Sequence, residues 1–301
     1  MSEAPGIELL KLTVDYGRTR ALSAVSTTLP GGSITGLLGR NAAGKSTMLA
    51  TIAGFRLPSA GQVLIDGEEP FENERLTSNI CLVRDGSDIL PSYSVRHNLQ
   101  IAADLRPNWD AGLAERLLTG FRLPPRKRVE ALSRGQRAAV GAIIGLASRA
   151  PVTIFDEIYL GMDAPARQLF FDTLLAEQIR EPRTVIITSH FLEEAERLLE
   201  SAMIIDQGKL LFHDALDDLS RHGGRVVGPV AAARDFARNY RVLGEQLLGG
   251  VAAVSIQGPL AKDAAELAAS AGLELEPLSL QDYYIGLTGD VEQGKEAGGT
   301  A

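Results

Sequence analysis

A glycine-rich segment, GRNAAGKST at residues 39–47, constrains the fold of this chain more than any other feature. It follows a short apolar run at 33–38, which predicts a buried strand, and it precedes residues 45–53, which have the pattern of a helix. The segment fits the spacing G-x-x-x-x-G-K-[S/T]. A chance glycine turn is the alternative, but the order strand, loop and helix predicts an α/β protein with a phosphate-binding turn.

The chemistry of phosphate binding explains these residue types at this spacing. Backbone N–H groups of the loop and of the following helix start point at phosphate oxygens and stabilise their negative charge. The Lys45 ammonium is expected to reach the β- and γ-phosphates, and the Ser46 hydroxyl is expected to coordinate Mg²⁺. We therefore predict that the loop binds a nucleotide through Gly39, Arg40, Asn41, Ala42, Ala43, Gly44, Lys45, Ser46 and Thr47.

The composition indicates a folded protein rather than a disordered or multi-pass membrane protein. Of the 301 residues, 45% are hydrophobic and 23% are charged, which is enough apolar material for a core. The longest nearly uncharged apolar stretch, residues 138–147, is shorter than the roughly 20 residues of a spanning helix. The single cysteine, Cys81, favours a reducing compartment. A net charge of −8 argues against a nucleic-acid partner.

The first part of the chain, residues 1–220, has the pattern of a nucleotide-binding domain. Continuous apolar runs at 152–155 and 184–188 are typical of parallel strands buried on both faces. Apolar residues recur at helical spacing over 91–119, where Pro107 interrupts them, and we expect a helical subdomain at about 88–148.

The character of the sequence changes near residue 221. The segment RHGGRVVGP, with its glycine pair, indicates a boundary between domains. Two helical patterns and two strand patterns follow it, so we predict a small α+β domain at 221–288. The Gly-rich, polar tail at 289–301 is expected to be disordered.

Four further motifs lie downstream of the glycine-rich loop. They are LSRGQ at 132–136, VTIFDE at 152–157, GMD at 161–163 and TSH at 188–190. In this order and spacing, the five motifs resemble those of the ATP-binding subunits of ABC transporters over residues 7 to about 215. The resemblance implies an α/β fold: a P-loop NTPase of the ABC cassette type, with a RecA-like mixed-sheet core and a helical subdomain.

The resemblance also implies roles for polar residues that follow the buried strands. Asp156 would hold Mg²⁺, and Glu157 would orient and deprotonate the attacking water. His190 would contact the γ-phosphate, and Lys45 completes the predicted catalytic set. Taken alone, the Asp-Glu pair is equally compatible with a solvated strand end, and a lone histidine is more often structural.

The LSRGQ motif has a function in the family only across a dimer. Ser133 and the N–H groups of the helix start after Gly135 would form an anion site for the γ-phosphate bound to a second subunit. Gln136 belongs to the same motif, and Asp163 belongs to the loop that contacts the partner. An ordinary helix cap at Ser133 is the alternative, and one geometry can satisfy both.

Two other features have competing interpretations. Tyr16 lies where the family places an aromatic ring against adenine, and the alternative is a tyrosine of the core. The basic cluster at 126–128 could suggest nucleic-acid binding, but no aromatic residues interleave with it. We interpret the cluster as a solvated face.

Two departures from the family pattern concern backbone shape near the site. Arg40 and Ala42 stand where proline and glycine are more common, and Ala42 loses conformational freedom if its φ must be positive. Glu157 is followed by Ile158 and Tyr159, where the family usually has Pro-Thr or Pro-Ser.

A third departure concerns the loop segment expected at 80–99. Alignment of its SVRHNL with the family's TVRENL places Asp85 where a glutamine usually senses Mg²⁺ and the attacking water and meets the membrane partner. Asp85 could still coordinate Mg²⁺ and contact the nucleotide, but it cannot donate a hydrogen bond when ionised. Hydrolysis is therefore expected, and the departure at Asp85 concerns the coupling of hydrolysis to transport.

The leading hypothesis is an ATP-binding and hydrolysing subunit that powers an ABC transporter by dimerising against membrane permease subunits. Its cofactors would be ATP and Mg²⁺, and its partners would be those permeases and a second ATP-binding subunit, identical or different. The segment 279–289 resembles the end of drug- and lipid-type exporter ATPases, which favours export. Residues 1–12 have no secretory signal pattern, so we expect a cytoplasmic protein, peripheral on the inner face of the membrane.

Two other classes of function stay open at this stage. One is a soluble ABC ATPase that acts on ribosomes or DNA, although such members usually carry two cassettes or a long coiled-coil insertion. The other is a nucleotide-sensing regulatory module with weak turnover, which Asp85 suggests. Membrane association would distinguish a transporter subunit from the soluble ABC ATPase. Phosphate release by the purified dimer would distinguish it from the regulatory module.

Overall fold

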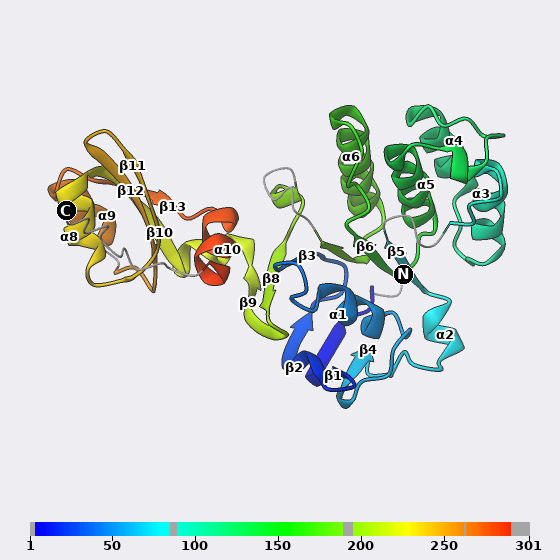
Figure 1. Cartoon of the computed structure of the whole chain (residues 1–301), viewed down its shortest axis with the longest axis horizontal. Coiled ribbons are helices and arrows are strands. Elements are labelled where there is room, and N and C mark those ends of the chain that lie inside the picture. Colours follow the sequence, from blue (N-terminus) through cyan, green and yellow to red (C-terminus); the bar gives the residue numbers. More distant parts are fainter. Residues whose placement is uncertain (1–3, 85–88, 189–194, 262, 290–301) are drawn as a thin grey trace, which may run out of the picture. The chain divides into compact units, whose positions relative to one another are not determined.

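The chain divides into two compact units, residues 1–213 and residues 214–301 (Figure 1). The structure is a computed structural model that describes residues 4–84, 89–188, 195–261 and 263–289. Each unit has its own sheet and its own hydrophobic core. The division falls between His213 and Asp214, ahead of the glycine pair that the sequence suggests as a boundary.

A largely parallel sheet forms the centre of the first unit. Its strands lie in the order β5 (Ile80–Arg84), β6 (Val152–Asp156), β7 (Thr184–Thr188), β3 (Ile34–Leu38), β8 (Ser201–Asp206) and β9 (Lys209–Ala215). The pairs from β5 through to β8 are parallel. Every residue of β3, β6 and β7 is buried, which explains why these strands are continuously apolar.

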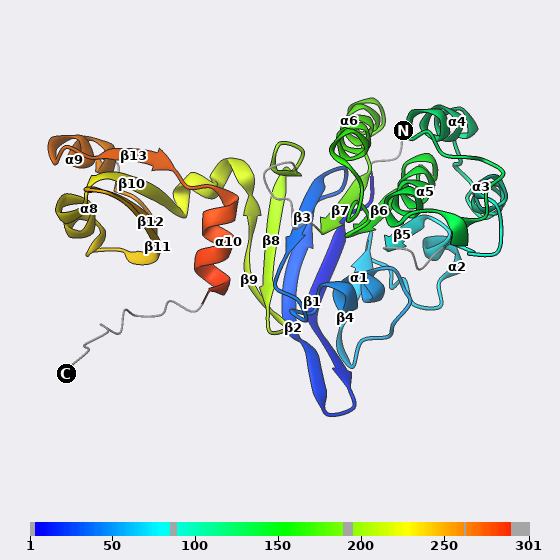
Figure 2. The same cartoon turned by 45° about the horizontal axis from the view of Figure 1, so that its top comes forward.

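A second, antiparallel sheet packs against the same core (Figure 2). Its strands lie in the order β2 (Thr19–Leu29), β1 (Ile7–Tyr16) and β4 (Ala60–Ile65). One apolar cluster contains side chains from both sheets and from α1 (Lys45–Ile52). The helix that follows the glycine-rich loop is thereby fixed to the two sheets, and the predicted α/β cassette fold is confirmed.

Five further helices of the first unit begin at side-chain caps, which explains where they start. Capping residues precede α2 (Glu74–Thr77), α3 (Val95–Asp104), α4 (Ala111–Gly120), α5 (Arg134–Ala147) and α6 (Ala164–Arg180). The caps are Asn73, Ser94, Asp110, Ser133 and Asp163, in the same order. Pro107 lies between α3 and α4, so the predicted interruption of the helical pattern is confirmed.

One segment differs from the sequence-based prediction. Residues 80–99 are expected to be a loop, but residues 80–84 form β5, whose three central residues are buried and paired in parallel with β6. The prediction was wrong because it joined the apolar run at 80–83 to the polar segment that follows it and that resembles the family's loop.

The second unit is a split β-α-β-β-α-β domain with an added helix. In chain order it contains β10 (Gly223–Pro229), α8 (Val230–Ala237), β11 (Arg241–Leu248), β12 (Val251–Gln257), α9 (Ala264–Ser270), β13 (Glu274–Pro277) and α10 (Leu280–Thr288). The antiparallel strands lie in the order β11-β12-β10-β13. An apolar cluster from the sheet, α8 and α9 forms its core.

Two strands of this domain, β10 and β11, are not apparent in the sequence. The glycine pair interpreted as a boundary lies inside β10, where a Cβ atom on Gly223 would be 2.1 Å from the Ile256 carbonyl oxygen. The glycines therefore permit close approach of neighbouring strands. β11 is almost entirely exposed, so its side chains do not form a clear apolar pattern.

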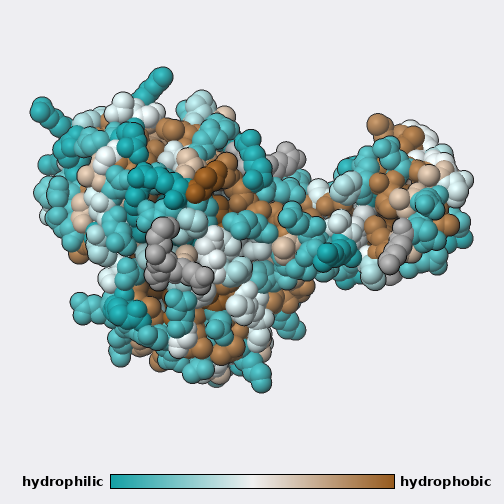
Figure 3. Space-filling model, turned by 180° about the vertical axis from the view of Figure 1, so that it is seen from behind, coloured by the Kyte–Doolittle hydropathy of each residue, from teal (hydrophilic) through white to brown (hydrophobic). Residues whose placement is uncertain are grey.

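Polar and apolar residues are intermingled on the face of the molecule in Figure 3. Several large apolar side chains are more than half exposed, including Phe55, Leu57, Leu105, Ile179 and Leu248. Of the helices within the described ranges, none combines the length and the hydropathy needed to cross a bilayer.

Candidate active site

The glycine-rich loop joins the carboxyl end of β3 to the start of α1, and its backbone requires small residues. A Cβ atom on Gly39 would lie 2.5 Å from a carbonyl oxygen of β8, and one on Gly44 would lie 2.6 Å from a carbonyl oxygen of β2. Gly44 has a φ of 107°, and Ala42 has a φ of 64°. The positive φ considered for Ala42 is therefore present, and alanine adopts it less readily than glycine.

Lys45 is the first residue of α1, and its ammonium group turns back over the loop. Its Nζ donates hydrogen bonds to the carbonyl oxygens of Gly39 (2.7 Å) and Arg40 (3.2 Å). The same Nζ lies 3.8 Å from Oε1 of Glu157. The fold thus brings together the lysine and the glutamate that the sequence assigns to catalysis, although they are far apart in the chain.

The first turn of α1 has polar groups suited to an anion. Gly44 precedes the helix without a side-chain cap, and none of the residues described in this turn is acidic. Backbone N–H groups at such a helix start lack intrahelical partners and carry the positive end of the helix dipole. Ser46 is exposed and Thr47 is partly buried in the same turn. Together with Asn41 and Ala43 of the loop, this turn can bind phosphate.

Two carboxylates follow one another at the carboxyl end of β6, beside Thr188 at the end of β7. The Thr188 hydroxyl donates to Oδ1 of Asp156 (2.8 Å) and accepts a hydrogen bond from the backbone N–H of Glu157 (2.9 Å). Asp156 is 7% exposed, and the Glu157 side chain is 27% exposed. The buried, hydrogen-bonded Asp156 does not resemble a residue of a solvated strand end.

Thr188 is a site residue to which the sequence analysis assigns no role. It lies in the TSH motif, and the available signal was a hydroxyl group at the end of a buried strand. Its partners become apparent only when β7 is known to lie beside β6.

Two predicted site residues, His190 and Asp85, lie outside the described residues, so their roles stay predictions.

Tyr16, the last residue of β1, is 48% exposed, so the alternative of a core tyrosine is wrong. The guanidinium carbon of Arg56 lies 3.6 Å from the centroid of the Tyr16 ring, which is a cation–π contact. Arg56 also donates a hydrogen bond to the Asp15 carbonyl oxygen at 2.8 Å. An exposed ring held in this way can stack against a nucleotide base. Arg56, which holds the Tyr16 ring in place, was not identified from the sequence.

Three residues of the LSRGQ motif, Ser133, Gly135 and Gln136, line one cavity of about 400 Å³ together with Asp163. Ser133 caps α5: its Oγ accepts a hydrogen bond from the Gln136 backbone N–H, and Oε1 of Gln136 accepts one from the Ser133 backbone N–H. A Cβ atom on Gly135 would lie 2.3 Å from the Gly161 carbonyl oxygen, so glycine is required there. No residue of the fully described loop 39–47 lines this cavity.

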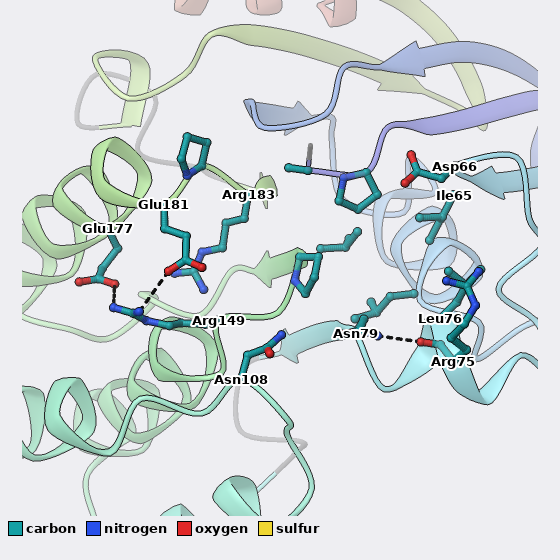
Figure 4. A pocket seen from close by; sticks show the side chains of 16 residues that line it. Ile65, Asp66, Arg75, Leu76, Asn79, Asn108, Arg149, Glu177, Glu181 and Arg183 are labelled. Atoms are coloured by element: carbon teal, nitrogen blue, oxygen red, sulfur yellow. Dashed lines mark hydrogen bonds and ion pairs between the residues drawn. The ribbon is translucent and has the colours of Figure 1, made fainter. Parts of the chain in front are cut away.

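A second cavity, of about 410 Å³, lies at the opposite edge of the central sheet, among the amino ends of β5 and β6 (Figure 4). Figure 4 shows Arg149 directed toward Glu177 and Glu181. Arg149 forms ion pairs with Glu177 (2.8 Å), Glu181 (3.1 Å) and Asp110 (2.8 Å). The hydrogen bond from the Leu113 backbone N–H, supported by the charge of Arg149, lowers the pKa of Asp110.

The charges around this second cavity balance. Three arginines and three carboxylates line it, namely Arg75, Arg149, Arg183, Asp66, Glu177 and Glu181. Arg183 is 5% exposed, and both its terminal nitrogens donate to the Leu146 carbonyl oxygen (3.3 Å). Burial lowers the pKa of this guanidinium. Arg149 and Arg183 connect the ends of α4, α5 and α6.

Comparisons with known proteins agree with this geometry. Residues 22–159 match the family model described as ABC transporter. The chain is 30% identical to the Nod factor export ATP-binding protein I of Burkholderia orbicola, covering 96% of this chain and 98% of that one. It is 29% identical to the ABC transporter ATP-binding protein YtrB of Bacillus subtilis, over 71% and 73% of the two chains. A solved ATP-binding subunit of an ABC transporter is 25% identical over 71% of this chain and 92% of that chain, with a TM-score of 0.65.

The fold and the site define a nucleotide-binding ATPase of the P-loop class. The chain belongs to the ABC transporter family, as an ATP-binding subunit. The two alternatives, a soluble ABC protein that does not transport and a regulatory module, are not favoured by these relatives.

Proposed function

We propose that this subunit powers export by hydrolysing Mg-ATP at the carboxyl edge of its central sheet. The observation that carries the proposal is the convergence of loop 39–44, Lys45 and the β6 carboxylates, with 3.8 Å between Lys45 Nζ and Glu157 Oε1. A buried lysine, a helix start and a carboxylate with access to water are the groups that phosphoryl transfer requires.

The nucleotide would be held by the loop and by Tyr16. The N–H groups of residues 39–47 would surround the phosphates, and the Lys45 ammonium would exchange its carbonyl partners for phosphate oxygens. The Tyr16 ring would stack on the base, which fixes position more than identity. Stacking of this kind does not depend on base-specific hydrogen bonds.

A magnesium ion fits the oxygen donors at this edge. Mg²⁺ is usually held by one or two protein oxygens together with substrate phosphates, and Ser46 and Asp156 supply a hydroxyl and a carboxylate. Across the described residues, no cluster of three or more His, Cys, Asp or Glu forms a separate metal site. When bound, the ion would neutralise charge on the phosphates, and Asp85 is proposed as a further ligand.

Glu157 is the proposed general base. Its side chain is partly exposed and can reach a water molecule, while the hydrogen bond from its backbone N–H to the Thr188 hydroxyl holds the residue in position. His190 is proposed to contact the γ-phosphate. Lys45 would stabilise the charge that develops on the transferred group.

A second ATP-binding subunit would complete each site. Ser133, Gly135, Gln136 and Asp163 line a cavity that loop 39–47 does not reach, so they are proposed to act on nucleotide held by the other subunit. The test is complementation between two inactive variants, Lys45→Ala and Ser133→Arg. In a mixture, one site of each mixed dimer would combine an intact loop with an intact signature. ATP hydrolysis above that of either variant alone would support the shared site, and no recovery would count against a homodimer of this kind.

Membrane permease subunits are the proposed transport partners, and export is the proposed direction, since a relative that matches nearly the full length is named for export. The proposed location is the cytoplasmic face of the membrane. Cells with and without a candidate permease should be fractionated and probed for the chain. Recruitment to the membrane fraction only with the permease would support the proposal, and co-sedimentation with ribosomes instead would contradict it.

A further inference from the structure

Tyr159 is a buried tyrosine whose hydroxyl connects two strand ends. Its side chain is fully buried, and its ring centroid lies 5.3 Å from that of Phe171 and 6.0 Å from that of Phe170. The hydroxyl donates a hydrogen bond of 2.6 Å to the backbone carbonyl oxygen of Thr188. A phenylalanine would fill the same apolar space, so the hydroxyl group calls for a separate explanation.

The acceptor of this hydrogen bond is the residue that contacts the Asp156 carboxylate and the Glu157 backbone. The Thr188 side chain donates to Asp156 and accepts from the N–H of Glu157, while its carbonyl group accepts from Tyr159. Residues 156–159 and the end of β7 are therefore joined at three points. Rotation or withdrawal of the β7 end would change the position of Asp156 and of the Glu157 backbone together.

The backbone of Glu157 gives this connection a physical purpose. Glu157 has a φ of 55°, a left-handed conformation that residues other than glycine adopt at an energetic cost. Such a conformation persists only when surrounding contacts hold it. The hydrogen bond from Glu157 to Thr188 is one contact that holds it, and Tyr159 fixes the partner of that hydrogen bond.

We propose that Tyr159 is a positioning residue for ATP hydrolysis: it anchors the end of β7 so that Thr188 keeps Asp156 and Glu157 aligned. This rests on the proposed function, in which these carboxylates act on Mg-ATP. The sequence departs from the family's usual Pro-Thr or Pro-Ser at 158–159. A proline would fix the backbone φ at residue 158, and the Tyr159 hydroxyl would restrain this segment in its place. Displacement of a reacting group by about 1 Å can reduce a rate about 100-fold.

The test is Tyr159→Phe, which keeps the ring and removes only the hydroxyl. We expect kcat for ATP hydrolysis to fall by about tenfold or more, while the affinity for a fluorescent ATP analogue changes less than twofold. The control is Tyr240→Phe, the same chemical change on a ring that stacks on Phe236 in the second unit. All rates are measured well below the unfolding midpoint of each variant.

An unchanged kcat in folded Tyr159→Phe would overturn the proposal, even if its melting temperature falls, because that pattern shows a purely structural role. If Tyr159→Phe does not fold, Thr188→Ser and Thr188→Val test the link that the proposal requires, the alignment of Asp156 and Glu157 by the Thr188 hydroxyl. The serine variant, which keeps the hydroxyl, must then be at least several-fold faster than the valine variant, and equal rates would overturn the proposal. Absence of ATP hydrolysis in the wild-type protein would instead contradict the proposed function itself.

Discussion

The two edges of the central sheet carry charged residues at the ends of the same buried strands, but they use them differently. At the carboxyl edge, Lys45 and Glu157 lie 3.8 Å apart beside a loop and a helix start that can bind phosphate. At the amino edge, Arg149 is surrounded by three carboxylates within about 3 Å. Charged side chains at a strand end are therefore not by themselves a sign of catalysis. The carboxyl edge differs because a glycine-rich loop and the uncapped start of α1 add backbone N–H groups that can bind phosphate.

The largest expected effect concerns the carboxyl edge. Glu157→Gln keeps the shape of the side chain and removes the base, so phosphate release should fall by about 10²–10⁴-fold while ATP binding is kept. Steady-state hydrolysis and binding of a fluorescent ATP analogue measure the two quantities. Turnover at the wild-type rate would remove Glu157 from the catalytic role and weaken the contrast between the edges.

Lys45→Ala should act on binding. Loss of a charge-assisted contact to phosphate is worth roughly 1.5–3 kcal/mol, which corresponds to about a 10- to 150-fold weaker affinity for ATP. Equilibrium binding to the purified variant measures this change. Lys209→Ala is the matched control, because it makes the same change at an exposed lysine of β9 and should leave ATP affinity unchanged.

Arg149→Ala should show the opposite pattern. It leaves the buried Glu177 next to other carboxylates. The free energy of unfolding should fall by roughly 2 kcal/mol, less than for a pair that loses its only cation, because Arg180 still lies 3.8 Å from Glu177. ATP hydrolysis per folded molecule should stay unchanged. Urea unfolding and hydrolysis assays measure the two effects, with Arg238→Ala, whose ion pair is exposed, as the control. Loss of activity without loss of stability would contradict the assignment of the amino edge to stability rather than catalysis.

The smallest expected effect is a pH dependence at the amino edge. The folded state lowers the pKa of Asp110 below its ordinary value of 3.8, so the stability that this carboxylate contributes is present above that pH. It is lost as the pH falls through the lower pKa of the folded state. Urea unfolding of wild type and Asp110→Asn between pH 6 and pH 3 should give a difference in stability that shrinks as the pH falls. A constant difference would contradict this account.

The carboxyl edge was largely predictable because most of its polar residues lie in short contiguous motifs. The loop at 39–47 and the carboxylates at 156 and 157 each follow a buried strand, and local sequence is enough to identify that context. Thr188 was not predictable in its role, because its hydrogen bonds depend on which strand is the neighbour of β7. The same limit applies to Arg56, whose contact with Tyr16 joins residues from different parts of the chain.

The amino edge and the second unit were less predictable for related reasons. The partners of Arg149 are Asp110 at the start of α4 and Glu177 and Glu181 at the end of α6, and no spacing in the sequence connects Arg149 with these two helix ends. The apolar run of β5 lies next to a polar segment that resembles the family's loop, and the glycine pair of β10 is typical of a boundary. In both cases tertiary packing, rather than local preference, decides the conformation.

The double hydrogen bond at the start of α5 has a consequence for assembly. The Ser133 hydroxyl uses a lone pair to accept from the Gln136 N–H, which leaves its own proton available for an outside acceptor. An approaching phosphate could therefore engage this serine without uncapping the helix. The surface offered to a second subunit would then be preorganised, and association would not require that helix end to fray and re-form.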